Sequence, residues 1–122
     1  FAETSLALVA TPLAVLAPTL AKDAKLVLVS SSYVETPPPD FAHYAAAKGA
    51  VEAFTRAFAR ERSLPLVVAR PPRILTDMTN TAFGADDVLR AEDVAVSIVS
   101  SVVAASTSCT LLTAFEPQAE PA

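Results

Sequence analysis

The stretch KLVLVSSSYVETPPPDFAHYAAAK, residues 25–48, joins an apolar run to three serines, a proline-rich segment and the start of a helix. The apolar run, Lys25 to Val29, is typical of a buried strand in a parallel sheet. Three consecutive prolines cannot continue a strand ladder or a helix, so residues 33–40 are predicted to form an extended, stiff loop. Asp40 can cap the helix that follows, because a carboxylate accepts hydrogen bonds from the free amides of a first turn. This stretch therefore predicts a strand, a loop and a helix in succession, as in an α/β fold.

Three polar side chains of this stretch can act together. Tyr44 and Lys48 are four positions apart, so on a helix they lie on the same face. An ammonium held beside a phenol lowers the pKa of the phenol from about 10, which makes it a usable acid or base near neutral pH. Ser31 follows the strand, with Ser30 and Ser32 as adjacent alternatives, and can present a hydroxyl at the carboxyl end of the sheet. Ligands of open α/β sheets bind at that end, which makes these residues a candidate site.

This combination resembles the short-chain dehydrogenase/reductase family, in which a serine after a strand is followed by Tyr-x-x-x-Lys on the next helix. Ser31 precedes Tyr44 by thirteen positions, which is the usual separation in that family. The resemblance implies that Tyr44 is the general acid/base. It also implies that Lys48 lowers the pKa of Tyr44 and holds the nicotinamide ribose, while Ser31 polarises the substrate carbonyl.

The resemblance continues after the next strand, where residues 70–76 read RPPRILT. Pro71, Ile74 and Thr76 match the family pattern Pro-Gly-x-(Val/Ile)-x-Thr, and the resemblance implies that this loop contacts the nicotinamide amide and the pyrophosphate. Pro72 stands where the family prefers glycine, and this reduces backbone freedom where a cofactor must approach closely. Arg70 and Arg73 can contact a phosphate or an acidic carrier, although solvated loop arginines are commoner. Residues 79–89 resemble the variable substrate lid of the family.

A second departure from the family pattern lies near the start of the chain. The family often has an asparagine there as a fourth catalytic residue, and the register falls instead on Thr4 or Ser5. This departure and Pro72 leave a second hypothesis open, in which the chain is a degenerate, non-catalytic scaffold or dimerisation half of such a domain.

Periodicity and breaker residues predict the remaining elements. They are a buried helix over residues 6–20, bent or ended by Pro12 and Pro18, a helix over 41–62, a strand over 64–69, a helix over 91–104 and a strand over 109–115. Right-handed crossovers make the three strands parallel and adjacent. In the 41–62 helix an apolar stripe repeats at intervals of four, three and four residues, through Ala47, Val51, Phe54 and Phe58. Glu52 and Arg56 of that helix are predicted to form an exposed ion pair.

Composition narrows the classes of partner and of site. A net charge of −4 and a pI near 4.8 disfavour nucleic acid and anionic membranes as partners. A single cysteine, Cys109, excludes an internal disulfide, and one histidine makes a zinc site improbable, so no metal is expected. The uncharged run from Leu6 to Leu20 lacks the basic flank of a signal peptide and is shorter than the roughly 20 residues of a membrane span. We expect a cytoplasmic protein.

The resemblance implies the C-terminal half of a Rossmann-like, doubly wound parallel sheet, without the N-terminal nucleotide-binding half. Residues 1–122 are then one partial, catalytic-half domain, ending in an acidic tail over residues 116–122. Only two glycines, Gly49 and Gly84, occur, and neither belongs to a G-x-G-x-x-G turn. Because the chain starts at Phe1 rather than at a methionine, we expect a longer polypeptide or a second chain to supply the missing half and to cover the first strand's edge. By itself this chain is expected to be inactive. The expected cofactor is NADP or NAD, the substrate a small carbonyl compound or alcohol, and the assembly a homo-oligomer.

Overall fold

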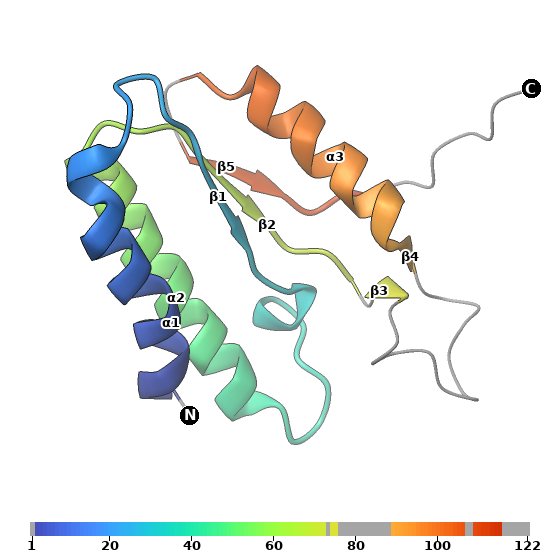
Figure 1. Ribbon diagram of the computed structural model, residues 1–122. Helices are drawn as coiled ribbons and strands as arrows, with labels where there is room; N and C mark the ends of the chain where they lie inside the picture. The colour runs from blue at the N-terminus through green and yellow to red at the C-terminus, as the bar shows by residue number, and fades with distance from the viewer. Residues whose placement is uncertain (1, 73, 76–88, 107–108, 116–122) are drawn as a thin grey trace, which may run out of the picture.

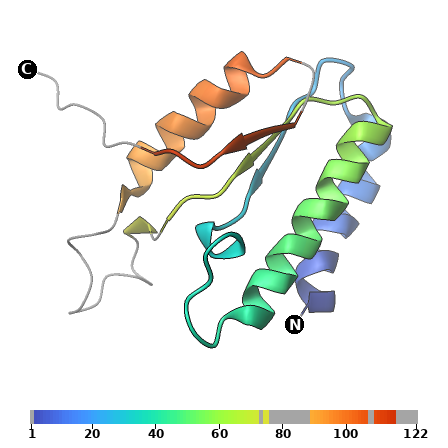
Figure 2. The same cartoon turned by 180° about the vertical axis from the view of Figure 1, so that it is seen from behind.

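A three-stranded parallel sheet lies between two layers of helices in the computed structural model, which describes residues 2–72, 74–75, 89–106 and 109–115. The elements in chain order are α1 (Ala2–Leu16), η1 (Ala17–Thr19), β1 (Leu26–Val29), η2 (Ser32–Val34), α2 (Ala42–Glu61), β2 (Leu66–Ala69), β3 (Ile74–Leu75), β4 (Leu89–Arg90), α3 (Ala91–Ala104) and β5 (Cys109–Leu112). Figures 1 and 2 show α1 and α2 on one side of the sheet and α3 on the other. The arrangement is a partial Rossmann-like α/β fold, and the fold class predicted from the sequence is confirmed.

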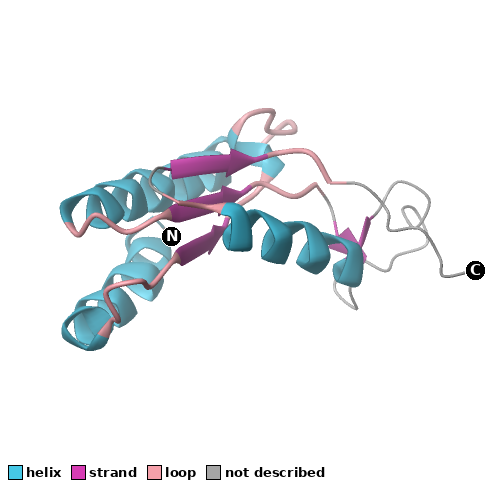
Figure 3. Cartoon of the chain, turned by 90° about the horizontal axis from the view of Figure 1, so that it is seen from above, coloured by secondary structure: helices cyan, strands magenta, loops and turns pink. Residues whose placement is uncertain are grey.

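The sheet has the strand order β1-β2-β5, and both pairs are parallel. Figure 3 shows the three arrows side by side and pointing the same way. Leu66 of β2 is in register with Leu26 of β1 and with Cys109 of β5. All four residues of β2 are buried, because this strand has a neighbour on each edge and a helix over each face. The prediction of three adjacent parallel strands is therefore correct.

Helix α2 supplies the main cover of one sheet face, and α1 packs beside it. Its buried positions include Ala47, Val51, Thr55 and Phe58, which agrees with the predicted stripe. Phe54 is only partly buried and stacks on the ring of Phe58. The central cluster joins α2 to the sheet through Leu28, Val51, Ala59, Leu66 and Val68. Burial of these apolar side chains against β2 fixes the position of α2 on the sheet.

Strand β1 is not buried on both faces as its composition predicted. Leu28 is 9% exposed, whereas Val27 and Val29, which point to the opposite face, are 41% and 51% exposed. The reason is that β1 forms the edge of the sheet and that α3 packs on β2 and β5 rather than on β1. The accompanying prediction, that the edge and one face of the first strand lie open in this chain, agrees with these exposures.

Helix α1 differs from the prediction in its bounds and in its burial. The sequence predicts a buried helix over residues 6–20, but the helix begins at Ala2, continues through Pro12 and ends at Leu16, with Pro18 in η1. Leu8 and Val15 are 72% and 70% exposed. An apolar helix is buried only where other elements surround it, and α1 is covered on the side that meets α2. Its apolar composition therefore led to an incorrect prediction of burial.

The segment between β1 and α2 differs in two ways from the predicted extended loop with a capping aspartate. Residues Ser32–Val34 form the short 3-10 helix η2. Asp40 has a φ of 67°, in the left-handed region, and the capping position belongs to Phe41, which makes no side-chain capping bond. Asp40 thus forms the turn that leads into α2 instead of capping it.

The last helix and strand follow the predicted order. Helix α3 has the predicted bounds, and the Lys25 ammonium donates hydrogen bonds to the carbonyl oxygens of Val102 and Val103 at its C-terminal end. The final strand ends at Leu112 rather than at residue 115. The short parallel pair of β3 and β4 was not predicted. In the part of the chain that the structure describes, no helix is both long and apolar enough to cross a membrane.

Candidate active site

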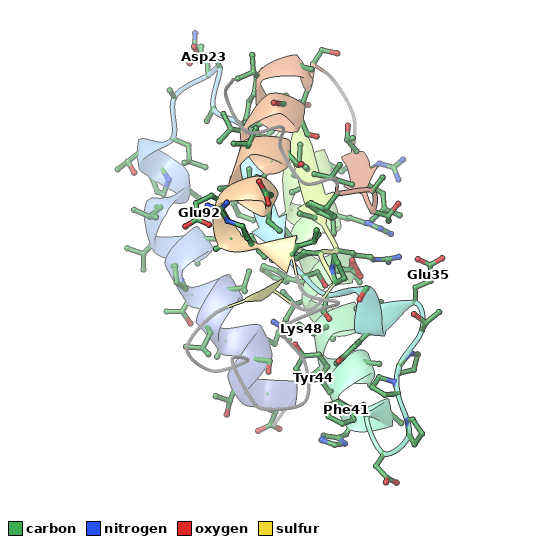
Figure 4. The ribbon with its side chains drawn as sticks, turned by 90° about the vertical axis from the view of Figure 1, so that its right-hand side faces the viewer. Asp23, Glu35, Phe41, Tyr44, Lys48 and Glu92 are labelled. Atoms are coloured by element: carbon green, nitrogen blue, oxygen red, sulfur yellow. The ribbon has the colours of Figure 1, made fainter. Side chains whose placement is uncertain are left out.

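Tyr44 and Lys48 lie on the first half of α2, and their side chains are neighbours. The Lys48 Nζ atom is 5.7 Å from the centroid of the Tyr44 ring, and both side chains are partly buried. Figure 4, which views the side toward which β1 and β2 run, shows the two residues next to each other. The helical spacing of four thus brings an ammonium and a phenol together.

Ser31 is hydrogen-bonded to Tyr33, and the ring of Tyr33 contacts the ring of Tyr44. The Oγ atom of Ser31 accepts a hydrogen bond of 3.1 Å from the backbone N–H of Tyr33, as the cap of η2. The Tyr33 ring lies edge-to-face with the Tyr44 ring, at 6.0 Å between centroids. Phe41 completes the trio, at 5.6 Å from Tyr33 and 6.1 Å from Tyr44. Because the Ser31 Oγ atom is the acceptor of this bond, the bond does not use the Ser31 O–H as a donor.

The serines on either side of Ser31 anchor the loop to β2. The Ser30 N–H donates to the Ala69 carbonyl at 2.7 Å, and the Ser32 N–H donates to the Pro71 carbonyl at 3.1 Å. The Ser30 hydroxyl is buried and has no hydrogen-bond partner within the described residues. These bonds hold the carboxyl ends of β1 and β2 together, where parallel sheets bind their ligands.

A buried ion pair fixes α2 against the end of β2. The Arg70 Nε donates to Glu52 Oε1 at 2.8 Å and its Nη2 to Glu52 Oε2 at 3.0 Å. The side chains are 15% and 4% exposed, respectively. The Glu52 hydrogen bond and charge, with a contribution from the charge of Glu35, raise the pKa of Arg70 above its usual value, although burial opposes this shift. The two hydrogen bonds of this pair join the end of β2 to α2, the helix that carries Tyr44 and Lys48.

Two predictions about these residues were wrong. Glu52 does not form an exposed pair with Arg56, and Arg70 is not a solvated loop arginine. The helical spacing allows the Glu52–Arg56 contact, but Glu52 faces the sheet. There the guanidinium of Arg70, at the end of β2, donates two hydrogen bonds to the carboxylate of Glu52. Arg70 is therefore committed to Glu52 and is not available for a phosphate or an acidic carrier.

The predicted cofactor loop is described only in part. Pro71 is buried at the end of β2, while Pro72 is exposed. The backbone of Ile74 forms β3, in register with Leu89 of β4. Thr76, Arg73 and most of the predicted lid, residues 79–88, lie outside the described residues, as does the tail over residues 116–122. Near the start of the chain, Thr4 is exposed and Ser5 partly buried on α1.

Sequence reasoning missed two residues of this region, Tyr33 and Glu52. Glu52 lies four positions after Lys48, so the spacing that pairs Tyr44 with Lys48 also places Glu52 one turn further along α2. That signal was present in the sequence. No spacing rule relates Tyr33 in η2 to Tyr44 in α2, so their contact depends on how the loop folds back.

The site thus combines a phenol, an ammonium and a hydroxyl at the carboxyl edge of a parallel sheet. A comparison with protein families finds that residues 5–87 match the model of the short chain dehydrogenase family. No curated protein is similar enough to match the chain. The family match indicates an oxidoreductase-type function, and members of this family typically use NAD or NADP. Residues 5–87 make up more than half of this chain, and the chain therefore belongs to the short-chain dehydrogenase family.

Proposed function

We propose that this chain is the catalytic half of a nicotinamide-dependent oxidoreductase that interconverts a ketone and an alcohol. The observation that carries the proposal is the Lys48 ammonium at 5.7 Å from the Tyr44 ring, beside a serine loop at the end of β1. A phenol at this place can exchange a proton with a substrate oxygen, because the neighbouring ammonium stabilises the negative charge left on it.

The described residues fit a nicotinamide cofactor with its hydroxyl-rich ribose. The Lys48 ammonium lies on α2, and Ser30, whose buried hydroxyl has no hydrogen-bond partner among the described residues, directly follows β1. A buried hydroxyl without a partner is costly unless a ligand or water completes it, which favours a polar ligand here. We assign cofactor binding to Tyr44 and Lys48 and, by the family pattern, to Pro71, Ile74 and Thr76. When bound, the cofactor supplies hydride transfer to or from the carbonyl carbon.

The chain's own residues handle the proton and the oxygen. In the reducing direction Tyr44 donates its phenolic proton to the substrate oxygen, and in the oxidising direction it accepts that proton. The Ser31 O–H donates a hydrogen bond to the same oxygen and stabilises the charge that develops there. The Glu52–Arg70 pair acts at a distance from the reacting atoms by fixing α2 relative to β2.

A complementing half of the domain is part of this proposal. The open edge of β1, with Val27 and Val29 exposed, is a surface on which another parallel strand can pair. We propose that the nucleotide-binding half, on the same or another polypeptide, pairs with this edge. Division of the domain at this point, a homo-oligomeric assembly and a cytoplasmic location stay predictions.

A non-catalytic scaffold is the second candidate. It is favoured by Pro72, whose ring restricts the backbone where the family prefers glycine, and by Thr4 or Ser5 in place of the asparagine. In this alternative the same fold is retained for its packing surfaces, and the exposed apolar side chains of α1, such as Leu8 and Val15, would lie in an assembly.

The two candidates are separated by following nicotinamide absorbance with simple ketones, using this chain together with the complementing half. We expect turnover, and we expect Tyr44→Phe to lower kcat at least about a hundredfold, the effect of losing a general acid. Tyr33→Phe is the matched control, because it keeps the ring contacts and removes a hydroxyl that the mechanism does not use. Turnover by the Tyr44→Phe protein equal to that of the parent would rule out the mechanism, and no turnover by the parent would favour the scaffold.

A further inference from the structure

A depression of about 570 Å³ lies at the end of α2 that is remote from Tyr44. Its walls come from the last turns of α2, the residues between α2 and β2, and the starts of β2 and β5. The lining residues are Arg56, Ala59, Arg60, Ser63, Leu64, Leu66, Ser106 and Cys109. Figures 1 and 2 show these elements meeting where β2 and β5 begin, opposite to the start of α2. From Tyr44 to Arg60 the helix rises about 24 Å, so the depression is separate from the candidate active site.

The charge of this depression is opposite to that of the chain as a whole. Arg56 and Arg60 are four positions apart on α2 and therefore lie side by side, while the whole chain has a net charge of −4. Among the described residues that line the depression none carries a carboxylate. The ion pairs found in the described part of the chain involve other arginines, Arg70 and Arg90. Two neighbouring cations repel each other, and a bound anion between them offsets this repulsion.

The remaining lining is amphipathic. Ser63, Ser106 and Cys109 add two hydroxyls and a thiol, and Leu64 adds a partly exposed apolar side chain. A volume of about 570 Å³ falls in the range of small-molecule sites, which combine mostly apolar walls with a few polar groups. An inorganic anion alone would leave the exposed part of Leu64 without a contact.

We propose that this depression binds a small amphipathic anion, with a carboxylate or phosphate head between Arg56 and Arg60 and a short aliphatic part against Leu64. The site is independent of the nicotinamide chemistry, because it shares no residue with the Tyr44 region. It gives the domain a second ligand surface on the side of the sheet away from β1, so pairing of another strand with β1 does not cover it.

Cys109 is a built-in reporter of the charge at this site, because it is the only cysteine of the sequence and lines the depression. Iodoacetate and iodoacetamide alkylate a thiol by the same displacement, but only iodoacetate is an anion. We expect the double substitution Arg56→Gln with Arg60→Gln to lower the rate of alkylation by iodoacetate, relative to that by iodoacetamide, about fivefold. This is the effect of one contact between unit charges in water. Arg62→Gln is the matched control, since Arg62 stacks 4.2 Å from the Phe58 ring centroid and does not line the depression. An unchanged ratio in the double variant would overturn the assignment of the two arginines.

Ligand binding is tested by protection of Cys109 from the neutral reagent. Hexanoate, hexyl phosphate, hexanol and inorganic phosphate are compared as protectants in the parent and in the double variant. We expect hexanoate or hexyl phosphate to slow alkylation of the parent and to lose this effect in the double variant, and the stronger of the two identifies the head group. If hexanol protects as well as hexanoate or hexyl phosphate, the ligand need not be an anion and that part of the proposal is wrong. If inorganic phosphate protects equally well, the aliphatic part of the ligand is wrong. If none of the four compounds protects, the whole site is refuted. Far-ultraviolet circular dichroism of each variant confirms that a lost effect is not a lost fold.

Discussion

Replacing Glu52 by glutamine tests whether the buried pair with Arg70 holds α2 on the sheet. Glu52 is 4% exposed and accepts two hydrogen bonds, at 2.8 and 3.0 Å, from one guanidinium. The amide keeps one acceptor oxygen but places an N–H group against the second Arg70 donor, so one bond and the charge are lost. Removing one partner of a buried pair costs about 3–5 kcal/mol of unfolding free energy. Arg70 is 15% exposed and is still attracted by Glu35, so we expect the lower end, about 3 kcal/mol.

The pH dependence of this loss follows from the pKa of Arg70. That pKa is raised in the folded protein, chiefly by the hydrogen bond to Glu52. A cation whose pKa is raised on folding stabilises the fold fully below its unfolded pKa, and this stability is lost only as the pH rises through the higher folded pKa. For arginine both pKa values lie in strongly alkaline solution. We therefore expect the loss caused by Glu52→Gln to be the same at about pH 6.5 and about pH 8.5.

Urea unfolding followed by circular dichroism measures this loss. Glu61→Gln is the matched control, because Glu61 lies on the same helix, is exposed, and should change stability by less than about 0.5 kcal/mol. A Glu52→Gln protein as stable as the Glu61→Gln protein would refute the assignment of a clamping role to the pair. A loss that differs strongly between the two pH values would show that another titrating group carries the effect.

Two further perturbations test the edges of the fold. Lys25→Met removes the ammonium that donates hydrogen bonds to the last carbonyls of α3, and it should lower the unfolding free energy by about 1 kcal/mol. Lys22→Met, at an exposed neighbouring position, is the control and should cause no such loss. Equal losses in the two variants would contradict a capping role for Lys25. In hydrogen exchange, the amides of Val27 and Val29 should be unprotected in this chain and protected at least about a hundredfold once the complementing half is present, while Leu28 is protected in both. Fast exchange of Val27 and Val29 in the complemented protein would count against strand pairing at the β1 edge.

Local structure was largely predictable because it depends on neighbours in the chain. The apolar run from Leu66 to Ala69 is buried on all sides, as its composition predicts. Ala91 to Ala104 form the predicted helix, with acids in the first turn. The spacing of Tyr44 and Lys48 brought the ammonium to the phenol ring, because side chains four apart on a helix always share a face.

Burial and partner choice were not predictable in the same way. The apolar residues of α1 gave no sign that one side of the helix lies exposed, because exposure depends on which elements pack against it. The open face of β1 was expected only because half of the domain is absent from this chain. Glu52 had a nearby candidate partner in Arg56 and a better one in Arg70, eighteen positions away. Arg70 is the preferred partner because the fold places its guanidinium, which can donate two hydrogen bonds at once, next to the buried carboxylate of Glu52.

The sequence by itself determined the strand–helix order and the pairing of Tyr44 with Lys48, since these follow from periodicity within single elements. The parallel sheet followed from that order, because crossovers between strands are right-handed. Only the tertiary structure decided that the Tyr33 ring contacts Tyr44, that Arg70 pairs with Glu52 of α2, and that Arg56 and Arg60 line a depression with Cys109. The physical reason is that such contacts join residues far apart in the chain, whose meeting depends on how the elements pack rather than on the spacing of residues along any one of them.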